Sequence, residues 1–171
     1  GGQYFEGTTD ITRTIHLGTP TPIQKRHYTL VLKGHLALRQ LVFPKGTTGE
    51  QIDALAHQFL WQDGLDYGHG TGHGVGCNLC VHEGPQRISR AFTGVPLAPG
   101  MIVSNEPGLY LTGQYGIRIE NCCLINEIIS AQKSITGHGP FYGLEDLTKV
   151  PYARNLIETA LLNDQEIQAI D

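Results

Sequence analysis

A strand-like run that contains an arginine and a glutamate is the feature that most constrains the fold of this chain. Residues 117–125 are otherwise mostly apolar and rich in isoleucine, which favours a central β-strand. Successive side chains of a strand point to opposite faces, so Arg118 and Glu120 share one face while Ile117 and Ile119 occupy the other. Charged groups in such a strand are costly unless they are paired or bind a metal. Two interpretations follow: a buried ion pair between strands, or Glu120 as a metal ligand supported by Arg118.

The composition is that of a globular chain of about one domain: 171 residues, 40% of them hydrophobic and 16% charged. With a formal net charge of -4 and no dense cluster of Lys and Arg, we expect neither nucleic acid nor an anionic membrane as a partner. The longest apolar runs are shorter than the roughly 20 residues that a spanning helix needs. The sequence therefore indicates a protein that does not enter the membrane.

Helical and strand patterns alternate along the chain and predict an α+β fold. Alternation and β-branched residues predict a strand over residues 10–15, with Asp10 on the same face as two threonine hydroxyls. Thr21 as N-cap and Pro22 as first helical residue begin a helix that an apolar stripe extends to Pro44. A capping box at residues 48–51 begins a second helix, which we expect to end at Gly64.

Glycine recurs too often between residues 64 and 76 for a helix, so His69 and His73 are not the paired ligands of a helical HExxH protease. Glycines allow the backbone to approach a ligand or another strand closely. Together with His82, these histidines are either hydrogen-bonded residues of ordinary structure or imidazoles directed into a cavity. Glu106, directly before Pro107, is expected in extended backbone just before a chain reversal.

The four cysteines do not form a convincing zinc site. Cys77 and Cys80 have CxxC spacing, but Cys122 and Cys123 are adjacent in a strand and must point to opposite faces. We therefore interpret all four as reduced thiols, which indicates a cytoplasmic protein.

Several short segments together resemble one known family. They are residues 7–14 (GTTDITRT), 69–76 (HGTGHGVG), 81–85 (VHEGP), 105–108 (NEPG), 116–121 (GIRIEN) and 147–151 (LTKVP). Their order and spacing are similar to the C-terminal catalytic domain of the Xaa-Pro aminopeptidases, which belong to the pita-bread metallopeptidase superfamily. The resemblance extends over nearly the whole chain and implies the C-terminal portion of a pita-bread fold, a curved antiparallel sheet with flanking helices.

The resemblance also implies a site and an activity. Asp10, His73, Glu106 and Glu120 would hold two divalent metal ions, most often Mn²⁺ with Co²⁺ or Zn²⁺ as alternatives. His69 and His82 would bind substrate and move protons, Glu106 would accept a proton and Arg118 would support the site. The implied reaction removes the N-terminal residue from peptides with proline in second position, by attack of a metal-bridging hydroxide.

One departure from the family pattern concerns a fifth ligand, an aspartate that would lie just upstream of Gly1. Met101 is the only methionine, so we expect residues 1–171 to be part of a longer polypeptide and of its catalytic domain. Alone, the chain should bind metal weakly, show little activity, and expose a sheet edge that a homodimer would cover. Two alternatives to the aminopeptidase remain: a prolidase acting on Xaa-Pro dipeptides, and a non-catalytic module that binds peptides or proteins.

Overall fold

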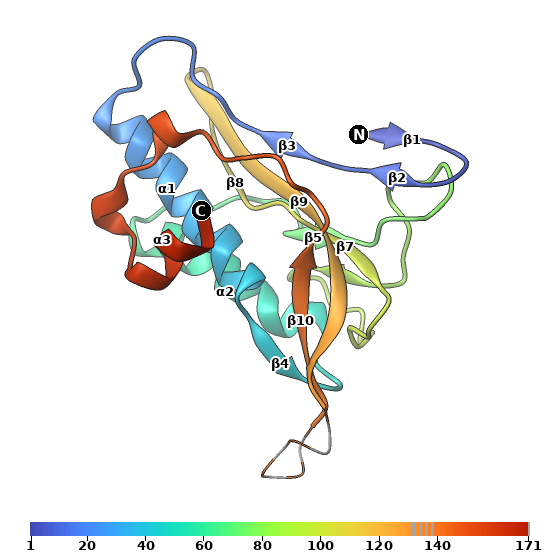
Figure 1. Ribbon diagram of the computed structural model, residues 1–171. Coiled ribbons are helices and arrows are strands. Elements are labelled where there is room, and N and C mark those ends of the chain that lie inside the picture. Colours follow the sequence, from blue (N-terminus) through green and yellow to red (C-terminus); the bar gives the residue numbers. More distant parts are fainter. Residues whose placement is uncertain (131–132, 134, 136, 138, 171) are drawn as a thin grey trace.

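The fold is α+β, as the sequence predicts, with helices packed against one antiparallel sheet (Figure 1). The computed structural model describes residues 1–130, 133, 135, 137 and 139–170. The helices are α1 (Pro22–Arg39), α2 (Gly49–Gln62) and α3 (Asp164–Ile170), with 3-10 turns η2 (Arg154–Leu156) and η3 (Thr159–Leu161). The strands are β1 (Gly2–Gln3), β2 (Thr8–Thr9), β3 (Thr12–Arg13), β4 (Val42–Pro44), β5 (Gly72–His73), β6 (Arg87–Ile88), β7 (Ile102–Asn105), β8 (Gly108–Leu111), β9 (Tyr115–Ile129) and β10 (Phe141–Asp146).

The predicted central strand is confirmed and is longer than expected. β9 pairs antiparallel with β3, β7, β8 and β10, and β4 extends the sheet beyond β10. Two small ladders, β1 with β2 and β5 with β6, lie outside this sheet. Residues near the middle of β9, such as Glu120 opposite Thr12 of β3, therefore have neighbours that are far away in the sequence.

The two faces of β9 have different environments. Ile117 and Ile119 are buried in a cluster with Tyr28 and Leu32 of α1, and Ile125 lies in a second cluster that includes residues of α2. Because side chains alternate along a strand, the face that bears Arg118 and Glu120 points away from the helices. The helices thus cover one face of the sheet and leave the other available for a site (Figure 1).

Helix α1 begins as predicted but ends earlier. Thr21 and Gln24 form a reciprocal capping box, and Pro22 stands in the first turn. The prediction that the helix continues to Pro44 was wrong, because it ends at Arg39 and residues 42–44 form β4. Phe43 pairs with Tyr142 of β10 and is only 3% exposed, so burial in the sheet outweighs the helical pattern.

Helix α2 matches its predicted limits. Its N-terminus is fixed by Thr48, whose backbone N–H donates to Gln51 Oε1 at 2.9 Å, and the helix ends before Gly64, which has a φ of 70°. This is left-handed backbone, which glycine adopts without strain.

The strand predicted over residues 10–15 is shorter in the structure. Only Thr12 and Arg13 join the ladder with β9. At the next position the Thr14 hydroxyl accepts from Arg118 N and donates to Arg118 O, both at 3.0 Å. A side chain has therefore replaced the backbone partner that a regular ladder would use.

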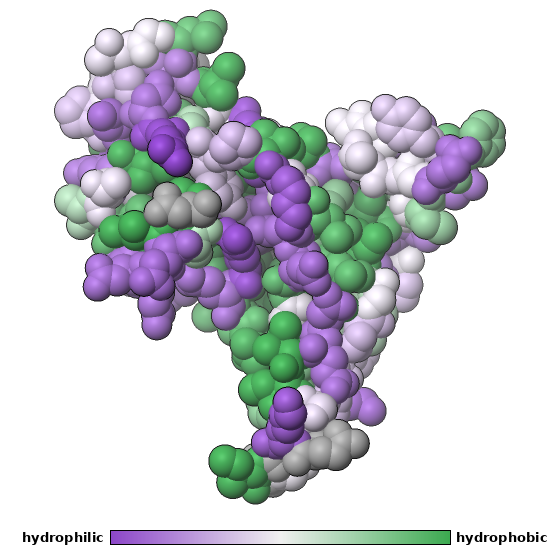
Figure 2. Space-filling view, in the orientation of Figure 1, coloured by the Kyte–Doolittle hydropathy of each residue, from purple (hydrophilic) through white to green (hydrophobic). Residues whose placement is uncertain are grey.

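Apolar surface is visible on the end of the molecule that the β9–β10 hairpin forms (Figure 2). In the strands of this region, Val42, Ile128 and Ile129 are at least 37% exposed. Within the described part of the chain, no helix combines the length and the hydropathy needed to cross a bilayer.

Candidate metal centre

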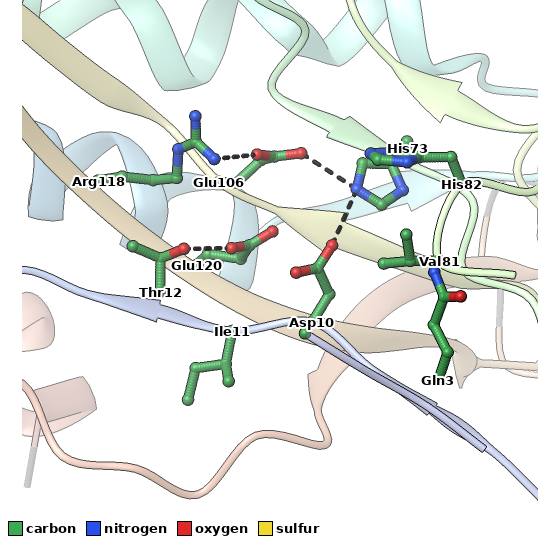
Figure 3. Close-up of a pocket in the computed structure, with 11 residues that line it drawn as sticks. Gln3, Asp10, Ile11, Thr12, His73, Val81, His82, Glu106, Arg118 and Glu120 are labelled. Atoms are coloured by element: carbon green, nitrogen blue, oxygen red, sulfur yellow. Dashed lines mark hydrogen bonds and ion pairs between the residues drawn. The ribbon is translucent and has the colours of Figure 1, made fainter. Parts of the chain in front are cut away.

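Three carboxylates and one imidazole converge on the open face of β9. Asp10, His73 and Glu120 each offer a ligand atom, and these atoms lie within 4.8 Å of one another. His73 Nε2 is 3.2 Å from Asp10 Oδ2 and 3.3 Å from Glu106 Oε1 (Figure 3). The structure thus brings together all four residues that the resemblance names as ligands.

Glu106 lies between β7 and β8, in the short segment where the chain leaves one strand and enters the next. The chain does not reverse its direction there, so the predicted chain reversal was wrong. β7 and β8 run in one direction along β9 without a change of register, with Asn105 opposite Asn121 and Gly108 opposite Arg118. Pro107 has no N–H to donate, and Glu106 N donates instead to Thr71 O at 2.7 Å. Glu106 consequently stands opposite Glu120, with the two carboxylates on neighbouring strands.

His73 is held in the tautomer that a metal ligand needs. Its Nδ1 lies 2.9 Å from Gly74 O, and because a carbonyl only accepts, Nδ1 must bear the hydrogen. In the neutral ring the Nε2 lone pair then faces the carboxylates. A backbone carbonyl that orients an imidazole in this way is the usual support of a metal-binding histidine.

The charges of the cluster favour a bound cation. Burial and the charge of Glu120 raise the pKa of Glu106 to about 7, and burial with the charge of Asp10 raises the pKa of Glu120. Arg118 Nη1 lies 3.5 Å from Glu106 Oε2, which offsets only part of this negative charge. Oxygen ligands with one imidazole suit hard or borderline divalent ions.

Thr12 and Ser104 hold the carboxylates in place. Thr12 Oγ1 donates to Glu120 Oε2 at 2.5 Å, and Ser104 Oγ donates to Glu106 Oε1 at 3.1 Å. Among the described residues, Glu120 Oε1 keeps no hydrogen-bond donor and can bind an ion, whereas Glu106 Oε2 faces Arg118 Nη1.

Tyr110 connects two of the predicted site residues and was missed in the sequence. Arg118 Nε donates to the Tyr110 hydroxyl at 2.8 Å, and this hydroxyl lies 2.9 Å from His69 Nε2. The hairpin register pairs Gly108 with Arg118, so Tyr110, two residues on, occupies the same face. The turn expected at Gly113 indicates a hairpin, and the register of that hairpin could have placed Tyr110 beside Arg118.

His69 and His82 lie beside the cluster and line two adjoining cavities. The His82 ring centroid is 4.2 Å from that of His73. The first cavity, about 380 Å³, is lined by Asp10 and Glu120, and the second, about 470 Å³, by His69. His73, His82, Glu106 and Arg118 line both. These four residues therefore form the wall that the two cavities share.

A buried polar network under the glycine-rich segment was also missed. Thr71 Oγ1 donates to Asp53 Oδ1 at 2.6 Å, and His57 lies between Asp53 and Asp66 at 3.3 and 2.7 Å. The hydroxyl of Tyr67 is 2.6 Å from Thr71 Oγ1. Because these partners come from α2 and from the loop after it, spacing in the sequence gave no signal of their contact.

The adjacent cysteines lie as predicted for neighbours in a strand. All four are free, and none belongs to a cluster of candidate ligands within the described residues. Cys122 Sγ donates to Asp10 O and Cys123 Sγ to Asp146 Oδ1, so the adjacent pair points to opposite sides as expected.

Solved structures share this fold. The X-prolyl aminopeptidase of Caenorhabditis elegans, described as a cytosolic enzyme with a di-nuclear active site, has a TM-score of 0.89 and 42% identity over 95% of this chain and 26% of its own. The prolidase of Pyrococcus furiosus has a TM-score of 0.68 and 33% identity over 83% of this chain and 37% of its own. The expected pita-bread fold is thereby confirmed.

The sequence comparisons agree. Curated relatives named probable Xaa-Pro aminopeptidase P, from Fusarium vanettenii and Sclerotinia sclerotiorum, are 59% and 56% identical over 97% of this chain, which spans 27% and 28% of their length. The model of metallopeptidase family M24 matches residues 1–127, and that of the C-terminal region of peptidase M24 matches residues 140–171. This chain therefore belongs to metallopeptidase family M24.

Proposed function

We propose that the protein containing this chain is a metal-dependent exopeptidase that removes the N-terminal residue from peptides with proline in second position. The main support is the convergence of Asp10, His73, Glu106 and Glu120 within one cavity wall. Relatives named Xaa-Pro aminopeptidase P cover nearly the whole chain, although the chain spans about a quarter of their length.

These four residues fit two divalent ions, and we propose Mn²⁺ as the resident metal. The donors are carboxylate oxygens and one imidazole nitrogen, with no thiolate among them. When bound, two such ions activate a water molecule and polarise the scissile carbonyl. Further support for two ions is the di-nuclear site described for the C. elegans enzyme.

The side chains around the cluster would accept and donate the protons of the reaction. Glu106, which stands opposite Glu120 in the wall of the first cavity, is placed to accept a proton. The departing prolyl nitrogen must gain a proton, and His82, whose ring centroid lies 4.2 Å from that of His73, is placed to hold it. Arg118 fixes Glu106 from the other side, and through Tyr110 it orients His69.

The two alternatives have less support. A prolidase would use the same ligands, but the P. furiosus prolidase is 33% identical to this chain, whereas the two relatives named probable Xaa-Pro aminopeptidase P are 59% and 56% identical. A non-catalytic module would not need a set of converging ligands, and Asp10, His73, Glu106 and Glu120 form one.

Three further proposals concern the setting of the activity. We propose that residues 1–171 are part of a catalytic domain, supported by the share of the relatives' length that they span. A cytoplasmic location is supported by the free thiols and by the description of the C. elegans enzyme as cytosolic. A homodimer stays a prediction, which sedimentation of the purified protein would test.

The test is release of the first residue from peptides by the full-length protein with Mn²⁺. We expect Ala-Pro-Gly to lose its alanine while Ala-Ala-Gly is left intact, and Glu106→Gln to abolish the reaction. Glu145→Gln, a matched change on the exposed surface of β10, should leave it unchanged. Cleavage of the dipeptide Ala-Pro alone would instead identify a prolidase, and no cleavage of any proline peptide would refute both enzymes.

A further inference from the structure

Arg87 occupies a position directly opposite a candidate metal ligand. In the ladder of β5 with β6, Arg87 is the partner of His73. Side chains of directly opposed residues in an antiparallel pair lie on the same face. Arg87 is exposed and lines the second cavity together with His69 and His82. Its guanidinium is therefore directed to the same side as the site.

This guanidinium has no partner among the residues that the structure describes. No carboxylate lies within ion-pair distance of it, whereas Arg90 is paired with Asp66 at 2.5 Å and Arg118 with Glu106 at 3.5 Å. The Arg118 guanidinium also donates to Tyr110. Arg87 thus contributes a positive charge to the second cavity, and Glu106, the one acidic residue among the described residues that line it, is paired with Arg118 instead.

The two cavities differ in their charged residues, and this difference assigns a direction to the peptide if the proposed function holds. The first cavity contains Asp10 and Glu120 in addition to Glu106, so the proposed metal ions would occupy it together with the first residue of a substrate. The second contains two arginines and no acid besides Glu106. The scissile bond would lie at the shared wall, so the residues after the proline would enter the second cavity.

We propose that Arg87 gives the protein a preference for peptides with a negative charge just downstream of the proline. The charge can be the α-carboxylate of a tripeptide or an acidic side chain in third position. This inference rests on the proposed function. Opposite charges about 4 Å apart in water-like surroundings attract by about 1 kcal/mol, which corresponds to about fivefold in kcat/KM.

Four tripeptides separate the two sources of charge in the full-length protein with Mn²⁺. Ala-Pro-Asp amide against Ala-Pro-Lys amide tests a side-chain charge, and Ala-Pro-Gly against Ala-Pro-Gly amide tests the terminal carboxylate. We expect about fivefold higher kcat/KM for the peptide with the downstream negative charge in at least one pair. Arg87→Gln should remove that preference, Arg87→Glu should reverse it, and 0.5 M NaCl should weaken it because the groups are exposed.

A matched control is Lys45→Gln, which removes one exposed positive charge outside both cavities. It should keep the preference. Equal rates within both pairs for the unaltered protein, or a preference that survives Arg87→Gln, would overturn the assignment while leaving the aminopeptidase intact.

Binding of the product dipeptides gives a readout that does not need turnover. By calorimetry, Pro-Asp should bind more tightly than Pro-Lys to the unaltered protein and equally to the Arg87→Gln variant. If no proline peptide is cleaved, the proposed function fails, and this titration still decides whether Arg87 selects a negative charge. Equal affinities of the unaltered protein for the two dipeptides would then refute it.

Discussion

Glu106→Gln should stabilise the metal-free chain at pH 8 although it removes a metal ligand. The Glu106 side chain is buried opposite Glu120, and its pKa is raised from 4.5 to about 7. Between pH 4.5 and pH 7, Glu106 loses its carboxyl proton in the unfolded chain but keeps it in the folded chain. Stability therefore falls as the pH rises from 4.5 to 7 and stays reduced above it.

The size of the effect follows from the pKa change. One pH unit corresponds to about 1.4 kcal/mol, so a pKa near 7 costs about 3 kcal/mol at pH 8. Partial access of water to the cavity reduces this to about 2 kcal/mol. Glutamine keeps the oxygen that accepts from Ser104, and loss of the half-exposed ion pair with Arg118 costs less than about 1 kcal/mol.

The assay is urea denaturation of the chain in EDTA at pH 5 and pH 8. We expect Glu106→Gln to gain about 1–2 kcal/mol at pH 8 and less than about 1 kcal/mol at pH 5. Glu145→Gln, on the exposed surface of β10, should gain nothing at either pH. A Glu106→Gln variant no more stable than the unaltered chain at pH 8 would refute the argument that uncompensated negative charge makes this site a cation site.

Two further predictions concern the support of His73. Gly72→Ala should prevent normal folding, because a Cβ there would lie 1.9 Å from Ser104 O. We expect a low soluble yield and an altered circular dichroism spectrum, and a native-like spectrum of the variant would contradict this prediction. Thr71→Val removes a buried hydrogen bond to Asp53 and should lower the free energy of unfolding by about 1–3 kcal/mol in urea, whereas an unchanged value would mean that the Asp53–His57 network does not support the site.

The ligands could be predicted from the sequence because each lies in a short segment whose pattern is local. Alternation in residues 117–125 placed Arg118 and Glu120 on one face, and the structure agrees. The glycine-rich context excluded a helix around His73, which is correct. The remaining ligands, Asp10 and Glu106, were predicted from the order of the short motifs that resemble the aminopeptidase family.

The errors arose where distant segments decide the local structure. Residues 42–44 have a pattern compatible with a helix, but pairing with β10 makes them a strand. Glu106 and Pro107 resemble a turn, yet the pairing of β7 and β8 with the same strand keeps the chain straight. Tyr110 was missed for the same reason, since its contacts depend on the register of a hairpin.

The most direct test of the metal centre is a calorimetric titration of this chain with Mn²⁺ beside its Glu106→Ala and Glu145→Ala variants. If Asp10, His73, Glu106 and Glu120 form the site, the chain will show saturable binding that Glu106→Ala weakens at least tenfold and Glu145→Ala leaves unchanged. Binding that survives Glu106→Ala unaltered, or that Glu145→Ala weakens equally, would contradict the assignment.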